Sequence, residues 1–161
     1  MDTKFEKNWI LWYHHEKDNW KLSGFRQLYK ITTIKELWQL YNNWHVVGGV
    51  TNKHVFIMQE GVSPLWEDTE NINGGCWSFK VHEDNADELW EDLSVHLVAE
   101  SLYQNDKDKI LGLSLCLKKN NNVVIKIWNK SSKFNSLKLL NNKLLEKWGT
   151  DIIYIAHMPN N

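Results

Sequence analysis

The sequence contains a single arginine, Arg26, and only two prolines and two cysteines among its 161 residues. With one arginine, planar bidentate arginine clamps on an anion are largely unavailable, so an anion would be held by lysine point charges instead. The cysteines, Cys76 and Cys116, form neither a CxxC motif nor a histidine-cysteine cluster with zinc-binding spacing. We therefore expect free thiols in a reducing compartment.

The sequence also lacks an excess of charge and a long apolar run. Its formal net charge is −1, which argues against a broad basic surface that coats a nucleic-acid backbone but not against a local pocket for one charged group. No apolar run approaches the roughly 18 residues needed to span a bilayer, and the N-terminal MDTKFEKNW lacks the apolar stretch of a signal peptide. We expect a monomeric protein with no membrane segment. Its expected compartment is the cytoplasm, and the nucleus is a second one. The length fits a single domain over residues 1–161.

Two kinds of apolar pattern divide the chain into strands and helices. Runs rich in aromatic and β-branched residues, or alternating with period two, predict strands at 8–15, 25–31, 54–59, 76–81, 110–119, 123–128 and 151–156. Apolar residues at helical spacing predict helices at 32–44, 83–103 and 134–148. With a hairpin turn at 120–122, these elements indicate an α+β fold, an antiparallel sheet with three helices on one face and its other face free.

The same periodicities assign side chains to faces. Trp38, Trp90 and Trp148 lie on or beside helix stripes, and core packing is the favoured interpretation for each. Trp9 and Trp12 are an odd number of residues apart in one strand, so they are expected on opposite faces. Period two in the strand at 110–119 predicts that Leu111, Leu113, Leu115 and Leu117 share one face. Helical spacing in the third helix predicts that Leu137, Leu140, Leu144 and Trp148 point inward.

Two of the ten tryptophans fall in polar stretches typical of loops. Trp20 lies in HHEKDNWKLSG and Trp66 in GVSPLWEDTENINGG, and a surface loop is a poor place to bury an indole. One interpretation is that each ring folds down as a lid. The other is that the two exposed rings sandwich a flat ligand, because stacking contributes about 1–3 kcal/mol per base.

Glu67, which directly follows Trp66, indicates which flat ligand the two tryptophans would bind. Cation–π attraction adds about 0.5–2 kcal/mol if the stacked ring is cationic. A carboxylate beside the indole can accept two N–H groups from the edge of a guanine, and such charge-assisted contacts are about twice as strong as neutral ones. A planar, cationic base with a guanine edge is 7-methylguanine, the base of an mRNA cap.

Beyond these residues, the chain resembles the eukaryotic translation initiation factor 4E family, the mRNA cap-binding proteins. The segments NWILWYHH, TTIKELWQLYNNW, GVSPLWED, NINGGCW, LWEDLSVHLVAES and VVIKIW are similar to family segments in the same order, from about Trp9 to Ile155. The resemblance implies a curved antiparallel sheet with three helices on its convex face and a cap-binding slot on the concave side. It implies that Trp20 and Trp66 stack on the base, that Glu67 reads the guanine edge and that Trp128 contacts the methyl side.

The chain departs from the family where the family holds the cap phosphates. Cys76 stands at the position of one family arginine and Val124 at that of a family lysine. Lys118 takes the place of a second arginine, with Lys119 next if the turn slips, and Lys126 shares a strand face with Trp128. The resemblance therefore implies a short, divergent member that holds the triphosphate with Lys118, Lys119 and Lys126. It leaves open whether the source is a cell or a virus.

The resemblance also implies a partner surface on the helical side. Ile34 and Trp38, neighbours at i,i+4, coincide with the family's docking patch for a helical scaffold peptide, an eIF4G-like or 4E-binding-type partner. Glu91 stands where the family has a leucine in this patch, while Val95, one turn on, is still apolar. We expect the patch to be weakened for apolar peptides and to favour a peptide with a basic residue opposite Glu91.

Several other functions compete with cap binding in translation initiation. A competitor or repressor of translation would hold the cap without the scaffold, and a carbohydrate-binding module would use exposed tryptophans for sugars. An enzyme is not expected, because the sequence has no glycine-rich phosphate loop, nucleophile elbow or HExxH motif. His14 and His15, adjacent in a strand, face opposite ways and so are not expected to share a metal. Neither a cofactor nor a metal is expected.

Overall fold

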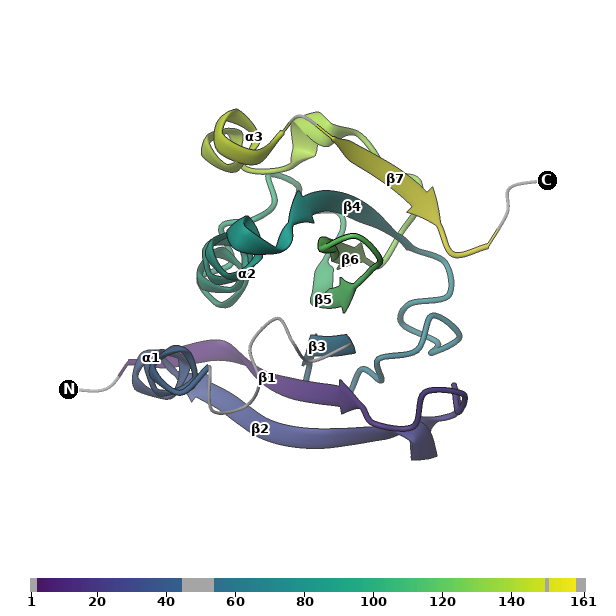
Figure 1. The fold of residues 1–161 in the computed structure, drawn as a ribbon. Coiled ribbons are helices and arrows are strands. Elements are labelled where there is room, and N and C mark those ends of the chain that lie inside the picture. The colour runs from purple at the N-terminus through teal and green to yellow at the C-terminus, as the bar shows by residue number, and fades with distance from the viewer. Residues whose placement is uncertain (1–2, 45–53, 150, 159–161) are drawn as a thin grey trace.

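Seven strands form one curved antiparallel sheet in the computed structural model, which describes residues 3–44, 54–149 and 151–158 (Figure 1). Neighbouring strands follow the order β2-β1-β3-β5-β6-β4-β7, and every pair is antiparallel. The strands are β1 (Lys4–His14), β2 (Phe25–Thr33), β3 (His54–Gln59), β4 (Gly75–His82), β5 (Ile110–Leu117), β6 (Asn122–Asn129) and β7 (Ile152–Ala156).

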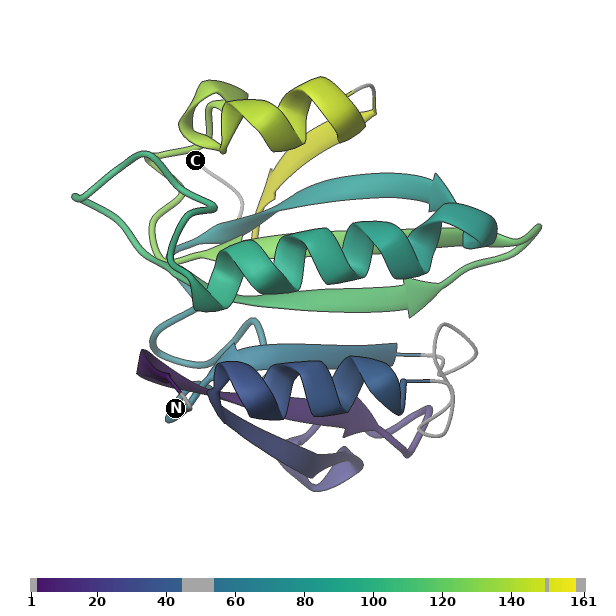
Figure 2. The ribbon, with the colours of Figure 1, turned by 90° about the vertical axis from the view of Figure 1, so that its left-hand side faces the viewer.

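Three helices, α1 (Ile34–Asn42), α2 (Glu83–Val98) and α3 (Asn142–Trp148), lie side by side on the convex face of the sheet (Figures 1 and 2). Helix α1 begins at the expected threonine pair, because the Thr33 side chain accepts a hydrogen bond from the backbone N–H of Glu36 as an N-cap. The predicted α+β arrangement of a curved sheet backed by three helices is confirmed.

Apolar side chains form a separate cluster on each face of the sheet. The larger cluster joins the sheet to all three helices, through residues such as Leu37, Leu89 and Leu144. The smaller cluster lies on the concave face and contains Trp12 and Trp128 but no described helix residue. Trp9 belongs to the first cluster and Trp12 to the second, as their odd separation predicts. A packed concave face gives a rigid floor for a ligand site.

Two predicted helices are shorter in the structure. Helix α2 ends at Val98, and Glu100 has φ 56°, a left-handed conformation that a continuing helix does not allow. The segment predicted as a helix from residue 134 instead forms a 3-10 turn at Leu137–Leu139, followed by α3 with Asn141 as its N-cap. Leu137 is 37% exposed, so the prediction that it points inward is wrong.

One leucine of β5 lies on the other face from its predicted neighbours. Leu113 and Leu115 pack under the helices, whereas Leu111 belongs to the concave cluster. The pairing of β5 with β6 is irregular between Ile110 and Gly112, and such a bulge reverses the alternation of side chains beyond it. The period-two prediction therefore fails at Leu111. At the other end of β5 the expected hairpin is confirmed, since Asn120 and Asn121 both have φ near +60°, at 60° and 61°.

Trp38 is a residue for which the core position predicted from helical spacing is wrong. Helix α1 buries Leu37 and Leu40, whereas Ile34 and Trp38 are 42% and 44% exposed. Core packing is thus confirmed for Trp90 and wrong for Trp38. Trp148 is half-buried, and its indole N–H donates to Asp92 Oδ2 at 2.9 Å.

Candidate functional site

A cavity of about 380 Å³ opens on the concave side of the sheet, on the face opposite the helices. Its volume lies within the roughly 300–1,000 Å³ typical of small-molecule sites. Its walls come from the β1–β2 loop, the loop after β3, strands β3 to β6 and the residues around the end of β7. The structure thereby brings six of the predicted ligand residues to one cavity: Trp20, Trp66, Glu67, Lys118, Lys126 and Trp128.

Trp20 forms one wall and is 55% exposed. Its ring stacks on His14 at a centroid distance of 4.1 Å, and His14 in turn stacks on Phe25 at 4.5 Å. His14 Nε2 donates to the backbone carbonyl of Asn19 at 2.8 Å, and the Asn19 side chain donates to Ser23 at 3.0 Å. The loop residue Trp20 is therefore held against the end of β1 rather than folded into the core.

Trp66 and Glu67 line the same cavity from a different loop, which is braced by its own polar side chains. Asp68 accepts hydrogen bonds from the backbone N–H groups of Ser63 and Glu70, both at 2.9 Å. The Asn71 amide, which is fully buried, donates to the carbonyl oxygens of Ser63 (3.0 Å) and Leu65 (2.8 Å). These bonds fold the loop over itself, which leaves Trp66 44% exposed and Glu67 exposed beside it.

Trp128 forms the floor of the cavity and is buried. Its indole N–H donates to Ser114 Oγ at 3.0 Å, and its ring meets Phe56 edge to face at 6.0 Å. His157 lies over it at 4.9 Å and approaches Cys76 Sγ to 3.9 Å. Burial raises the pKa of the Cys76 thiol, so this side chain is neutral.

The charges of the lining are segregated. Glu67 lies beside Trp66, whereas Lys118 and Lys126 reach the cavity from the end of β5 and from β6. Burial, with the charges of His14, Lys126 and Lys118, lowers the pKa of His54 to about 3. Burial and Lys126 likewise lower the pKa of His157 to about 4. At neutral pH the charged lining residues are therefore one carboxylate and two ammonium groups.

Several lining residues were missed by the sequence reasoning. His54, Phe56 and His157 line the cavity, as do Ser78 and Ser114. The two serines could have been found by strand parity, because both pair with Lys126 in the sheet. Lys119 does not line this cavity but a neighbouring groove, so its assignment to the triphosphate stays a prediction.

The predicted partner residues lie on the helical face. Ile34 and Trp38 are exposed on α1, and Trp38 meets Tyr41 edge to face at 5.9 Å. Burial raises the pKa of Tyr41, while Ser94 lowers it and the negative charge of Glu91 raises it. Glu91 is exposed on α2, which lies beside α1 (Figure 2). Val95 is half-buried on the same helix as Glu91. The four predicted residues thus lie on two neighbouring helices on the same face of the sheet.

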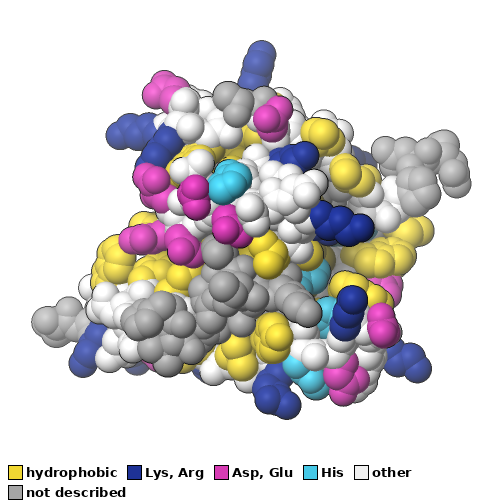
Figure 3. Space-filling model, in the orientation of Figure 1, with side chains coloured by type: hydrophobic (Ala, Val, Ile, Leu, Met, Phe, Trp, Pro, Cys, Tyr) yellow, Lys and Arg dark blue, Asp and Glu magenta, His cyan; other side chains and the backbone are white. Residues whose placement is uncertain are grey.

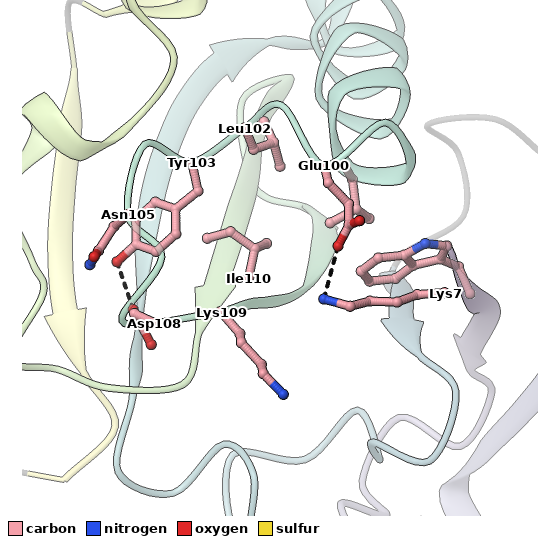
Figure 4. Close-up of a pocket in the computed structure, with 10 residues that line it drawn as sticks. Lys7, Glu100, Leu102, Tyr103, Asn105, Asp108, Lys109 and Ile110 are labelled. Carbon is pink, nitrogen blue, oxygen red and sulfur yellow. Dashed lines mark hydrogen bonds and ion pairs between the residues drawn. The ribbon is translucent and has the colours of Figure 1, made fainter. Parts of the chain in front are cut away.

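A different cavity lies where β1 meets the segment between α2 and β5 (Figure 4). Its volume is about 130 Å³, below the range of small-molecule sites. Two pairs of its polar groups bind one another, since Lys7 Nζ pairs with Glu100 Oε1 at 2.9 Å and the Tyr103 hydroxyl donates to Asp108 Oδ2 at 2.6 Å. This cavity is a weaker candidate than the concave one.

The described part of the chain contains neither a membrane-spanning helix nor a cluster of metal-binding side chains. None of its helices combines the length and the apolar character needed to cross a bilayer. No group of three or more histidine, cysteine, aspartate or glutamate side chains in residues 3–44, 54–149 and 151–158 is arranged to hold a metal ion.

Known proteins resemble this chain in sequence and in fold. Eukaryotic translation initiation factor 4E-2 of Arabidopsis thaliana is 31% identical over 108 residues, which cover 64% of this chain and 45% of that protein. Factor 4E-1 of Caenorhabditis elegans is 26% identical over 132 residues, 78% of this chain and 61% of that protein. The chain spans about half the length of the curated relatives it matches.

Solved structures share the fold along nearly the whole chain. The complex of C. elegans eIF4E-3 with the 4E-binding protein Mextli superposes with a TM-score of 0.80 at 19% identity, covering 98% of this chain and 94% of that one. The complex of Ascaris suum eIF4E-3 with m7G cap gives a TM-score of 0.80 at 22% identity, covering 99% and 94%. The family model for eukaryotic initiation factor 4E matches residues 4–158, so this chain belongs to the eukaryotic initiation factor 4E family.

Proposed function

We propose that this protein binds the 7-methylguanosine cap of mRNA in the concave cavity. The observation that carries the proposal is the meeting of two exposed indoles, Trp20 and Trp66, with the carboxylate of Glu67 in one cavity. Family membership and the m7G complex of the A. suum structure support the same ligand. The protein acts by binding rather than as an enzyme, as befits a family of initiation factors.

The base is recognised by charge and shape together. Trp20 and Trp66 stack on its two faces, and the positive charge that methylation gives the ring strengthens each contact by cation–π attraction of about 0.5–2 kcal/mol. Glu67 accepts two N–H groups from the guanine edge. Trp128, buried in the floor, contacts the methyl side of the base.

The phosphates are held by lysines as point charges. Lys118 and Lys126 line the cavity beside Ser78 and Ser114, where hydroxyl groups can donate further hydrogen bonds. Because a lysine ammonium lacks the planar fork of arginine, the phosphate contacts are less directional than an arginine clamp. Neutral Cys76 adds no charge at the position of the family arginine.

Retention on resin distinguishes this function from carbohydrate binding. Wild-type protein should be retained on 7-methyl-GTP resin and released by free 7-methyl-GTP, and Trp66→Ala should pass through. Retention on oligosaccharide resin with none on the cap resin would instead make the cavity a sugar site. The Trp66 side chain is exposed, so its removal should leave the thermal unfolding midpoint within a few degrees.

A second proposed activity is the binding of a helical partner peptide on the α1–α2 surface. Ile34 and Trp38 expose apolar area at i,i+4 spacing, the spacing at which a peptide helix finds its anchors in a groove. The 4E-binding protein in the C. elegans complex supports this class of partner. Glu91 beside this patch favours a peptide that places Lys or Arg opposite it, because an unpaired carboxylate facing leucine is costly to desolvate.

With both surfaces working, the protein would act in translation initiation, in the cytoplasm and wherever else capped mRNA occurs. With only the cap site working, it would act as a competitor or repressor of translation. The affinity of the α1–α2 surface for a scaffold peptide separates these two roles.

A further inference from the structure

A second groove, of about 560 Å³, adjoins the cap cavity. It is formed by the end of β1, the start of β3 and the hairpin that follows β5. Three side chains, Trp20, His54 and Lys118, line both hollows, so the two are continuous. Figure 3 shows histidine, basic and acidic side chains around the hollowed right-hand part of the molecule. A ligand anchored in the first hollow can therefore extend into the second.

The charged side chains that line this groove all have one sign. They are Lys17, Lys118 and Lys119, and each is exposed. Lys17 is flanked in the sequence by the carboxylates of Glu16 and Asp18, but neither lines the groove, and that of Glu16 accepts a hydrogen bond from Asn19 Nδ2 at 2.8 Å. The groove is thus locally basic in a chain whose formal net charge is −1.

Four other surface lysines form ion pairs, whereas these three have none among the residues that the structure describes. Lys7, Lys30, Lys130 and Lys147 all form ion pairs with carboxylates, at 2.7–3.0 Å. None of the ion pairs among the described residues involves Lys17, Lys118 or Lys119. Their ammonium groups are available to an anion from outside the protein.

The groove also carries rings that suit bases. Tyr13 and His15, which are half-buried, line it together with Trp20, whereas His14 is buried between Trp20 and Phe25 and supports the Trp20 ring from behind. A basic groove lined by aromatic side chains is the usual way in which proteins hold single-stranded nucleic acid without reading its sequence. An acidic peptide would use the lysines but would gain little from the rings.

We propose that this groove binds the first nucleotides of the RNA chain that follows the cap, with Lys17 and Lys119 on its phosphodiesters. The inference rests on the proposed cap site, since a triphosphate beside Lys118 and His54 leads the chain into the groove. The cap thereby gives specificity, and the groove adds affinity that does not depend on the RNA sequence.

The test compares three ligands by titration at several salt concentrations: 7-methyl-GTP, a capped oligoribonucleotide of about six nucleotides, and the same oligonucleotide with an unmethylated 5′-triphosphate. Wild-type protein should bind the capped oligonucleotide about tenfold more tightly than 7-methyl-GTP. Lys17→Glu should weaken the capped oligonucleotide at least threefold and leave 7-methyl-GTP within twofold. It should also reduce the steepness of the salt dependence by about 0.7 or more, the contribution of one single-strand phosphate contact.

Lys138→Glu is the matched control, because Lys138 is also exposed but lies beside α3, at the other end of the sheet from β1. It should leave all three affinities unchanged. The inference is overturned if the capped oligonucleotide binds no more tightly than 7-methyl-GTP, or if Lys17→Glu weakens both equally, which would mean that it acts through the neighbouring Trp20. Failure of wild-type protein to bind 7-methyl-GTP would refute the cap site instead. The groove would then be tested with the uncapped oligonucleotide. If wild-type protein binds this oligonucleotide and Lys17→Glu does not, the RNA groove is supported. If wild-type protein does not bind it, the RNA groove is refuted.

Discussion

The indole of Trp20 lies on the imidazole of His14, with ring centroids 4.1 Å apart and planes inclined by 33°. His14 lines the neighbouring groove but not the cap cavity, whereas Trp20 lines both. Trp20 is thus supported from behind while part of its surface faces the cavity. Because ordering a free loop side chain on binding costs entropy, this support pre-organises one half of the proposed sandwich.

His14→Ala should therefore weaken 7-methyl-GTP binding about two- to tenfold, which corresponds to the 0.5–1.5 kcal/mol of an aromatic pair. The measurement is quenching of tryptophan fluorescence on titration. His14→Phe keeps a ring under Trp20 and should recover most of the affinity. If His14 acted only through its hydrogen bond, His14→Phe would bind as weakly as His14→Ala. If His14→Ala binds as tightly as wild type, the stack does not position Trp20.

Glu67 and Asp68 are adjacent carboxylates with different surroundings. Asp68 accepts two backbone N–H groups within its loop, and Glu67 is exposed at the cavity. Glu67→Gln should lower 7-methyl-GTP affinity about 10- to 100-fold, because it removes a charge-assisted contact of about 1.5–3 kcal/mol. Asp68→Asn should cost about fivefold or less, through the loop alone. An equal loss in both variants would deny Glu67 its role at the guanine edge.

Lys118 and Lys126 are expected to sense phosphate rather than base. Reversal of charge at either position should weaken 7-methyl-GTP about tenfold and the bare nucleoside 7-methylguanosine less than threefold, because only the nucleotide carries the anion. Isothermal titration of both ligands gives the comparison, with Lys138→Glu as a control for net charge. Equal losses for the two ligands would argue against phosphate contacts.

Glu91 is expected to limit the partner surface. Glu91→Leu should bind a helical 4E-binding peptide at least fivefold more tightly than wild type, since an apolar side chain replaces a carboxylate that the peptide must desolvate. The exposed carboxylate of Glu146 on α3 offers a control, and Glu146→Leu should leave the affinity unchanged. No gain in Glu91→Leu would place Glu91 outside the contact.

Most helices and strands, and the residues that line the concave cavity, could be predicted from the sequence. Much of this prediction depends on patterns within single segments. Loop tryptophans such as Trp20 and Trp66 stand out by their polar neighbours, and strand alternation placed Lys126 on the same face as Trp128. Two failures have different causes, since one lies in the pairing of two strands and the other in a helix cap that apolar spacing does not detect. A bulge beside Gly112 displaced Leu111, and the capping side chain of Asn141 began α3 later than its leucine spacing suggested.

Other parts of the site depend on the tertiary structure. Nothing in the residues before His54 or after Ala156 indicates that His54 and His157 would enter one cavity, because they come together only through the pairing of distant strands. The support of Trp20 by His14 likewise arises from the return of the β1–β2 loop onto the end of β1. Exposure of Trp38 is decided by which face of α1 meets the sheet.

The most direct test of the account is the preference for a methylated base, measured by parallel titration of wild-type protein with 7-methyl-GTP and GTP while tryptophan fluorescence is followed. The two ligands share the guanine edge and the triphosphate and differ in the methyl group that makes the base cationic. Because two cation–π contacts of about 0.5–2 kcal/mol each depend on that charge, 7-methyl-GTP should bind at least about fivefold more tightly. Equal affinity for the two nucleotides, or a preference for GTP, would contradict the tryptophan sandwich of Trp20 and Trp66.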